Sequence, residues 1–168
     1  YPEALFKDRV HAIRRPRPDE FQIKVAAEKI KASKNPIIIS GGGVFYSDAM
    51  EELSQFAIKH NIPVTQTVMG YSTMKRDHSH FAGQIGGLGG KNTNTLAKET
   101  DLAIAIGTKL ADFTTGSWAN FENKNFKLVS INVSRFDANK HLAQAVIGDA
   151  KVSLTELSQV LGNWKAGE

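Results

Sequence analysis

The feature that most constrains the fold is a short apolar run followed directly by three glycines and an amphipathic stretch, IIISGGGVFYSDAMEEL at residues 37–53. An apolar run of this length, bounded by Pro36 and Gly41, is typical of a buried parallel strand. The amphipathic stretch predicts a helix that covers the strand. The segment is therefore a βα unit, and its glycine turn either binds a nucleotide or only bends the chain.

The same alternation continues along the sequence. We expect strands at 36–40, 62–68, 101–107, 127–133 and 144–148. Helices are predicted from Asp19 to about residue 33, after a capping box of Asp48 and Glu51, from about Asn92, and after Asp149. The runs 37–39, 102–106 and 128–131 have no polar face and belong in the buried centre. This order predicts an α/β fold, a doubly wound and mainly parallel sheet of five or six strands with helices on both faces. Such a fold is Rossmann-like, as in the DHS-like NAD/FAD-binding fold.

Composition excludes several classes of protein. The 168 residues suffice for one domain with a hydrophobic core. The content of hydrophobic residues, 41%, and of charged residues, 23%, is ordinary for a soluble protein. No apolar run approaches a bilayer span, and the charges in residues 1–20 exclude a signal peptide, so we expect a cytoplasmic protein without a membrane partner. There is no cysteine for a disulfide or a zinc site. Arg14, Arg15 and Arg17 alternate with prolines, which favours an extended linker over a nucleic-acid patch.

Patterns that would indicate catalysis are scarce. Residues 41–46 read G-x-G-x-x-Y and the second strand ends without an acidic residue, so a nicotinamide cofactor is not expected. His78 and His80 could ligate a metal, but Asp77 is the only carboxylate nearby, and we expect a solvated loop. Asp112 follows a strand, where an aspartate commonly bonds its own backbone. The sequence therefore assigns no catalytic residue and no metal site.

Six segments in order resemble the central domain of thiamine diphosphate-dependent enzymes. They are IIISGGGVFYSDA, TVMGYSTM, HFAGQIGGLGG, DLAIAIGTKLADFTTGSW, SINVSRFDANKH and VIGDAKVSL. The resemblance implies a central domain at 19–162, with linkers at 1–18 and 163–168. Within that superfamily, DFTTGSW and INVSRFDANKH are most similar to the 3D-(3,5/4)-trihydroxycyclohexane-1,2-dione hydrolase family of myo-inositol catabolism. An acetolactate-synthase-like domain and a free-standing FAD- or nucleotide-binding domain of the same fold are the alternatives.

The resemblance implies a structural and assembly role inside a larger hydrolase that opens a cyclic diketone to 5-deoxy-glucuronate. In this superfamily thiamine diphosphate (thiamine pyrophosphate) and Mg²⁺ are bound by flanking pyrimidine- and pyrophosphate-binding domains, and the enzyme is a homo-oligomer. The Gly-Asp-Gly motif that holds the metal is absent from this chain. We therefore expect the parent protein to be a thiamine diphosphate-dependent C–C hydrolase and this chain alone to be inactive.

The resemblance also implies where a nucleotide crevice lies. Carried over from flavin-containing relatives, the contact positions are Gly42, Gly43, Thr67, Met69, Gly87, Gly107 and Lys109. Flavin-binding synthases have arginines where this chain has Lys109 and Phe113, and a ribose-binding aspartate where it has Asn132. Lysine and phenylalanine cannot reproduce the bidentate contacts of arginine with phosphate. We therefore expect a vestigial crevice that does not bind FAD.

Overall fold

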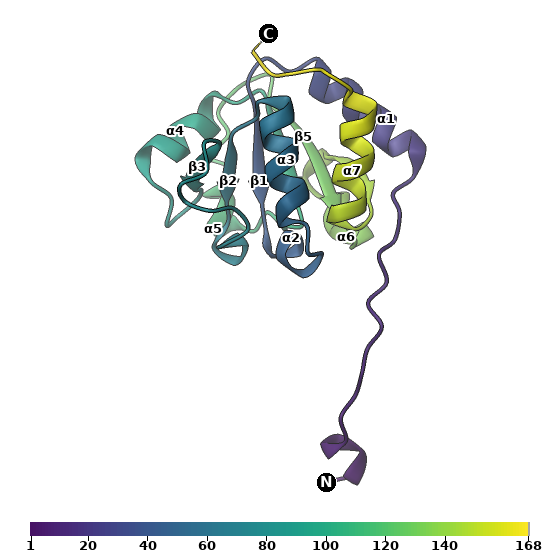
Figure 1. Cartoon of the computed structure of the whole chain (residues 1–168). Coiled ribbons are helices and arrows are strands. Elements are labelled where there is room, and N and C mark those ends of the chain that lie inside the picture. Colours follow the sequence, from purple (N-terminus) through teal and green to yellow (C-terminus); the bar gives the residue numbers. More distant parts are fainter. Residues whose placement is uncertain (168) are drawn as a thin grey trace.

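A computed structural model describes residues 1–167 and contains one six-stranded sheet with helices on both faces (Figure 1). The strands are Pro36–Ser40 (β1), Val64–Gln66 (β2), Phe81–Gln84 (β3), Leu102–Ile106 (β4), Lys127–Asn132 (β5) and Gln144–Ile147 (β6). All neighbouring strands pair in parallel, in the order β3-β2-β1-β4-β5-β6. The structure confirms the predicted doubly wound fold. The strand order reverses between β1 and β4, so the carboxyl ends of these strands flank the crevice where such sheets bind ligands.

The helices form two layers. They are Glu20–Lys31 (α1), Gly42–Tyr46 (α2), Met50–His60 (α3), Lys91–Glu99 (α4), Asp112–Thr115 (α5), Arg135–Ala138 (α6) and Ala150–Leu161 (α7), with 3₁₀ turns at Glu3–Phe6 (η1), Val68–Gly70 (η2) and Lys140–Leu142 (η3). One core cluster joins the sheet to α1, α3 and α7. A second cluster lies on the opposite face, against α4 and the loop after β4.

Strand β1 shows why the central runs are apolar throughout. Ile38 belongs to the cluster under α1, α3 and α7, whereas Ile37 and Ile39 belong to the cluster on the other face. Successive side chains of a strand point to opposite faces, so a strand covered on both sides has no face that is left for solvent. The expected burial of 37–39, 102–106 and 128–131 is confirmed.

The predicted capping box is wrong. Helix α3 begins at Met50, and its N-cap is Ala49, which makes no side-chain capping bond. The glycine turn expected after β1 contains the short helix α2, which begins at Gly42. The chain then reverses through Asp48 at φ 52°, and the Asp48 carboxylate pairs with Lys151 at 3.4 Å. The preceding short helix thus places Asp48 outside the capping position.

The edge of the sheet also differs from the expectation. Strand β2 has three residues, and its neighbour β3, FAGQ, is not among the strands expected from the sequence. All four residues of β3 are only partly buried, and Gly83 has φ 107°. A half-exposed edge strand that contains glycine shows neither an apolar run nor a regular alternation.

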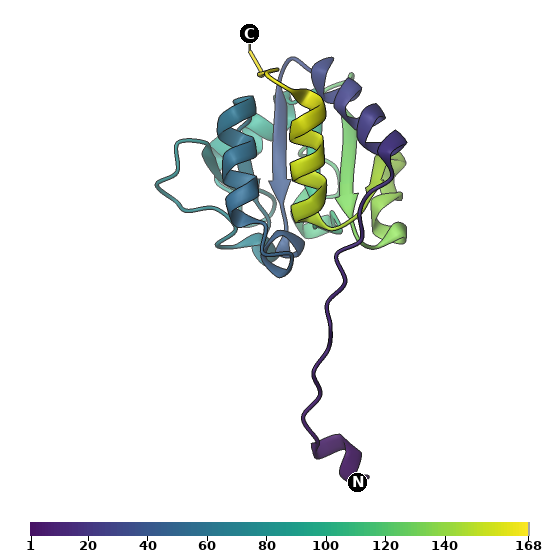
Figure 2. The same ribbon diagram turned by 45° about the vertical axis from the view of Figure 1, so that its right-hand side comes forward.

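The two terminal segments behave differently. The first 12 residues are exposed and extend away from the domain (Figure 2). At the other end the chain folds back: the Ala166 amide donates to the His60 carbonyl at 2.9 Å, and His60 Nδ1 lies 2.8 Å from the Trp164 carbonyl. His60 is fully buried, and this burial lowers the pKa of its imidazole. The linker bounds 1–18 and 163–168 remain a prediction, although residues 164–166 contact the domain. None of the helices in residues 1–167 is long and apolar enough to cross a bilayer.

Candidate functional site

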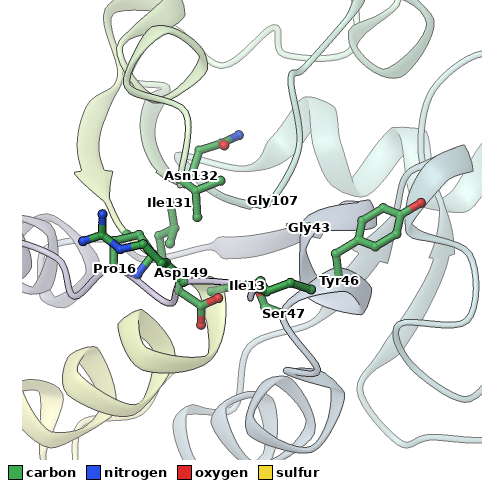
Figure 3. Close-up of a pocket in the computed structure, with 13 residues that line it drawn as sticks. Ile13, Pro16, Gly43, Tyr46, Ser47, Gly107, Ile131, Asn132 and Asp149 are labelled. Atoms are coloured by element: carbon green, nitrogen blue, oxygen red, sulfur yellow. The ribbon is translucent and has the colours of Figure 1, made fainter. Parts of the chain in front are cut away.

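A cavity of about 500 Å³ lies at the carboxyl ends of β1, β4 and β5 (Figure 3). Gly43 and Gly107 form one wall, from the turns that follow β1 and β4. Residues 131–133 and 148–150 form the wall beside β5 and β6, and Ile13, Arg14 and Pro16 of the N-terminal segment line it as well. The cavity thus occupies the crevice that the strand order predicts.

The two glycines are required by the packing of the turns against each other. The Gly43 amide donates to the Gly107 carbonyl at 2.9 Å. A Cβ on Gly43 would lie 2.6 Å from the Gly107 Cα, and Gly107 itself has φ 60°. Neither position accommodates a side chain without movement of backbone. Close packing of the two turns therefore explains why glycine is needed at these positions. The Gly43 amide already donates a hydrogen bond within the protein.

Asn132 joins the loops after β4 and β5. Its Nδ2 donates to the Thr108 carbonyl at 3.2 Å, and its Oδ1 accepts from the Ser134 amide at 3.0 Å. Both ends of the side-chain amide are thus occupied by backbone groups. Asn132 lines the cavity as a brace between two loops.

Arg15 fastens the N-terminal segment to the domain. Its guanidinium pairs with the buried Asp149 carboxylate at 3.1 Å and also donates to the Ser47 carbonyl. The Asp149 amide donates to the Pro16 carbonyl at 2.9 Å. The other Asp149 oxygen caps α7 by accepting from two backbone amides. One carboxylate therefore satisfies a helix N-terminus and neutralises the arginine of the segment.

Polar side chains at the ends of β1 and β2 bond to the η2 turn and to Thr73, which follows it. Ser40 Oγ lies 2.7 Å from Thr73 Oγ1, and Gln66 Nε2 donates to Thr73 Oγ1 at 3.2 Å. Thr67 is buried and accepts from the Gly70 amide at 3.0 Å. These groups could have faced a phosphate, but they hold the η2 turn in place.

The seven predicted crevice residues are spread over the turns that follow β1, β2, β3 and β4. Of the seven, only Gly43 and Gly107 line the cavity. A Cβ on Gly42 would lie 3.0 Å from the Met69 carbonyl, next to the turn that Thr67 caps. Gly87 donates to the Phe113 carbonyl at 2.9 Å. The role of these residues in binding a nucleotide stays a prediction.

Lys109 lies on the surface, in the vicinity of the Asp137 carboxylate. The ammonium of Lys140, which donates to Asp137 at 2.7 Å, is the main reason that the pKa of this carboxyl is lowered. Burial opposes this effect, and the charge of Lys109 adds to it. Lys109 therefore contributes only the smallest of these effects, and the structure gives it no ion pair among residues 1–167.

The remaining candidate residues are bonded locally or exposed. His78 Nε2 lies 3.0 Å from Ser54 Oγ, and His80 Nε2 lies 3.3 Å from Asn61 Oδ1. Asp112 is the exposed first residue of α5, and its expected bond to its own backbone does not occur among the hydrogen bonds of residues 1–167. An acid in the first turn is favoured by the helix dipole instead. In the same described part of the chain, no three His, Asp or Glu side chains are grouped so that they could hold a metal ion.

Sequence reasoning missed the walls contributed by the N-terminal segment and by residues 148–150. The sequence does contain a signal for the wall formed by residues 148–150, because it predicts Asp149 as a helix cap that follows a strand. The first wall depends on a contact between residues 15 and 149, far apart in the chain, and the alternation of arginine and proline gives no information on it.

The sequence matches the family described as "Thiamine pyrophosphate enzyme, central domain" over residues 23–157. The chain belongs to this family. The central domain is 44% identical over 161 residues to a 3D-(3,5/4)-trihydroxycyclohexane-1,2-dione hydrolase of Clostridium perfringens, covering 96% of this chain and 25% of the relative. It is 45% identical over 157 residues to 3D-(3,5/4)-trihydroxycyclohexane-1,2-dione hydrolase 1 of Bacillus cereus, covering 94% of this chain and 24% of the relative.

Solved structures agree on the fold of the central domain. A putative thiamin diphosphate-dependent enzyme from Mycobacterium smegmatis matches 93% of this chain and 30% of its own, with a TM-score of 0.72 at 19% sequence identity. At this identity the match shows the fold alone. The central domain spans about a quarter of the length of the curated relatives it matches.

Proposed function

We propose that this chain is the structural and assembly domain of a thiamine diphosphate-dependent hydrolase that opens the ring of trihydroxycyclohexane-1,2-dione to 5-deoxy-glucuronate in myo-inositol degradation. The observation that carries the proposal is the identity of 44–45% with relatives of that name, over nearly the whole chain. The alternatives, an acetolactate-synthase-like domain and a free-standing flavin domain, lack comparable support.

The proposal places the chemistry in the flanking pyrimidine- and pyrophosphate-binding domains, which would hold thiamine diphosphate and Mg²⁺. Two observations support this division. The chain spans about a quarter of the length of its curated relatives. The polar groups at the carboxyl ends of its strands, such as Asn132 and Thr73, are engaged in bonds that hold its own loops. The protein would act in the cytoplasm as a homo-oligomer.

We further propose that the cavity does not bind FAD. The Gly43 amide and both ends of the Asn132 side chain are already bonded to protein. Lys109 is exposed beside Asp137, and Phe113 lies against Gly87. A flavin pyrophosphate would therefore lack the charge-assisted bonds that arginines supply in flavin-binding synthases, each worth about 1.5–3 kcal/mol. Calorimetry that gave tight one-to-one binding of FAD would contradict this.

The proposed division of labour is tested with thiamine diphosphate and Mg²⁺. A ligand present at one hundred times its dissociation constant stabilises a protein by about 2.7 kcal/mol, which is visible in thermal melting. We expect this shift, and the consumption of the diketone, for the full-length protein and not for the 168-residue chain. Turnover by the chain alone would refute the assembly role. A full-length protein that binds thiamine diphosphate but leaves the diketone intact would refute the proposed substrate.

A further inference from the structure

Large apolar side chains are exposed together at the carboxyl end of the sheet. They come from the segments that follow β1, β2, β3 and β4, and we call them the apolar rim: Phe45, Tyr46, Met69, Tyr71, Leu88 and Phe113. Met69 and Tyr46 are 73% and 72% exposed. Scattered apolar residues are normal on a protein surface, whereas a continuous patch marks an interaction site.

The apolar rim is continuous from element to element. Phe45 and Tyr46 form an edge-to-face pair with ring centroids 5.8 Å apart on α2, and Gly42 of the same helix lies against Met69. Tyr71 and Leu88 line one groove of about 350 Å³. The Phe113 ring would lie 3.3 Å from a Cβ on Gly87, the residue before Leu88.

The N-terminal segment is seated on the same end of the sheet. Ile13 and Arg14 line the cavity together with the rim residue Tyr46, and Arg15 is bonded to the carbonyl of the next residue, Ser47. From there the chain extends outward beyond the carboxyl ends of the strands (Figures 1 and 2). Its side chains Leu5, Phe6 and Val10 are also exposed and apolar. Whatever precedes the segment is therefore tethered at the carboxyl end of the sheet, the end at which the apolar rim lies.

We infer that the apolar rim is the docking surface for the part of the same polypeptide that precedes residue 1 in the full-length protein. The inference rests on the proposed function, which places this chain between flanking domains. Because Arg15 and Asp149 hold the segment at the carboxyl end, the tethered part is present there at an effective concentration of about millimolar order. A contact of modest intrinsic affinity is then sufficient.

The test is photo-crosslinking in the full-length protein. Met69→p-benzoylphenylalanine and, separately, Phe113→p-benzoylphenylalanine place a probe on two elements of the apolar rim. Both side chains are more than half exposed, so the larger group should not disturb the core. The matched control is Ile58→p-benzoylphenylalanine on α3, an exposed apolar position near the end of that helix and away from the apolar rim.

After irradiation we expect both rim probes to crosslink to residues that precede Tyr1, with products that keep the mass of one chain on a denaturing gel. The Ile58 probe should give no such product. Products of twice the chain mass would overturn the inference in favour of a second copy. Crosslinks to residues after Glu168, or loss of crosslinking at both rim positions, would overturn it as well. The readout is independent of activity, so an inactive protein that gives the expected crosslinks would refute only the proposed function.

Discussion

Replacing Gly43 by alanine tests whether the glycine turn exists for close packing of two loops. The substitution adds one methyl group at a site where the new Cβ would lie 2.6 Å from the Gly107 Cα and 3.0 Å from the Gly107 carbonyl oxygen. Both neighbours are backbone atoms, so no side chain can rotate away. One of the two loops must move, and the bond from the Gly43 amide to the Gly107 carbonyl is weakened.

The expected loss of stability combines three effects. Overpacking of a closely packed site costs about 1–3 kcal/mol. Loss of the hydrogen bond costs about 1 kcal/mol. Alanine is favoured over glycine inside a helix by about 1 kcal/mol, which offsets part of this because Gly43 lies in α2. The net loss is about 2 kcal/mol, equivalent to a fall in melting temperature of roughly 4–8 °C.

Thermal and urea denaturation of Gly43→Ala and of the control Gly90→Ala measure the effect. Gly90 is the N-cap of α4 at φ −69°, and a Cβ there meets nothing within 4 Å. Alanine is a poorer N-cap than glycine, but it also lowers the conformational entropy of the unfolded chain. The two effects on the stability of Gly90→Ala should nearly cancel, to within about 0.5 kcal/mol. If Gly43→Ala proved as stable as Gly90→Ala, the close packing of Gly43 on Gly107 would not be what requires glycine.

Three further outcomes are expected. Asp149→Ala should lose about 1–2 kcal/mol in denaturation because two α7 amides lose their acceptor, whereas Asp149→Asn should retain most of the cap. The pKa of His60 is lowered in the folded state, so the unfolded chain binds a proton more readily. The free energy of unfolding should therefore fall as pH drops through about 6.5. This part of the pH dependence should vanish in His60→Gln and persist in the exposed control His11→Gln. Burial alone would raise the pKa of Asp101, but hydrogen bonds from three backbone amides and from Ser33 outweigh it and lower that pKa. The stability from Asp101 should thus be present above its usual pKa of 3.8 and be lost as pH falls below it, and acid titration of Asp101→Asn should lack this loss.

The centre of the fold could be predicted from the sequence because its physics is local. Runs such as Ile37–Ile39 have no polar face, so they fit only a strand covered on both sides. The sequence predicts Asp19 and Asp149 as helix caps, and each accepts two amides at the start of its helix. Side-chain chemistry next to the element it caps is visible in a short window of sequence.

The candidate site could be predicted only in part, because it depends on contacts between distant segments. Gly43 and Gly107 are among the predicted residues, but the packing of one against the other requires the parallel pairing of β1 with β4. The wall that Ile13, Arg14 and Pro16 add to the cavity depends on the ion pair between Arg15 and Asp149, in the last βα turn. Asp48 failed as a cap for a similar reason, since a preceding helix of five residues changed the direction of the chain.

The chain enters the domain at the carboxyl edge of the sheet and leaves it at the amino edge, where Ala166 bonds to His60 (Figure 1). The domain therefore separates whatever precedes it from whatever follows it by the length of the sheet. Its five-residue central strand alone sets the two attachment points about 17 Å apart along the strand direction, at roughly 3.3 Å per residue. Whatever is joined to the two ends therefore starts from opposite edges of the sheet, and the sheet lies between the two attachment points.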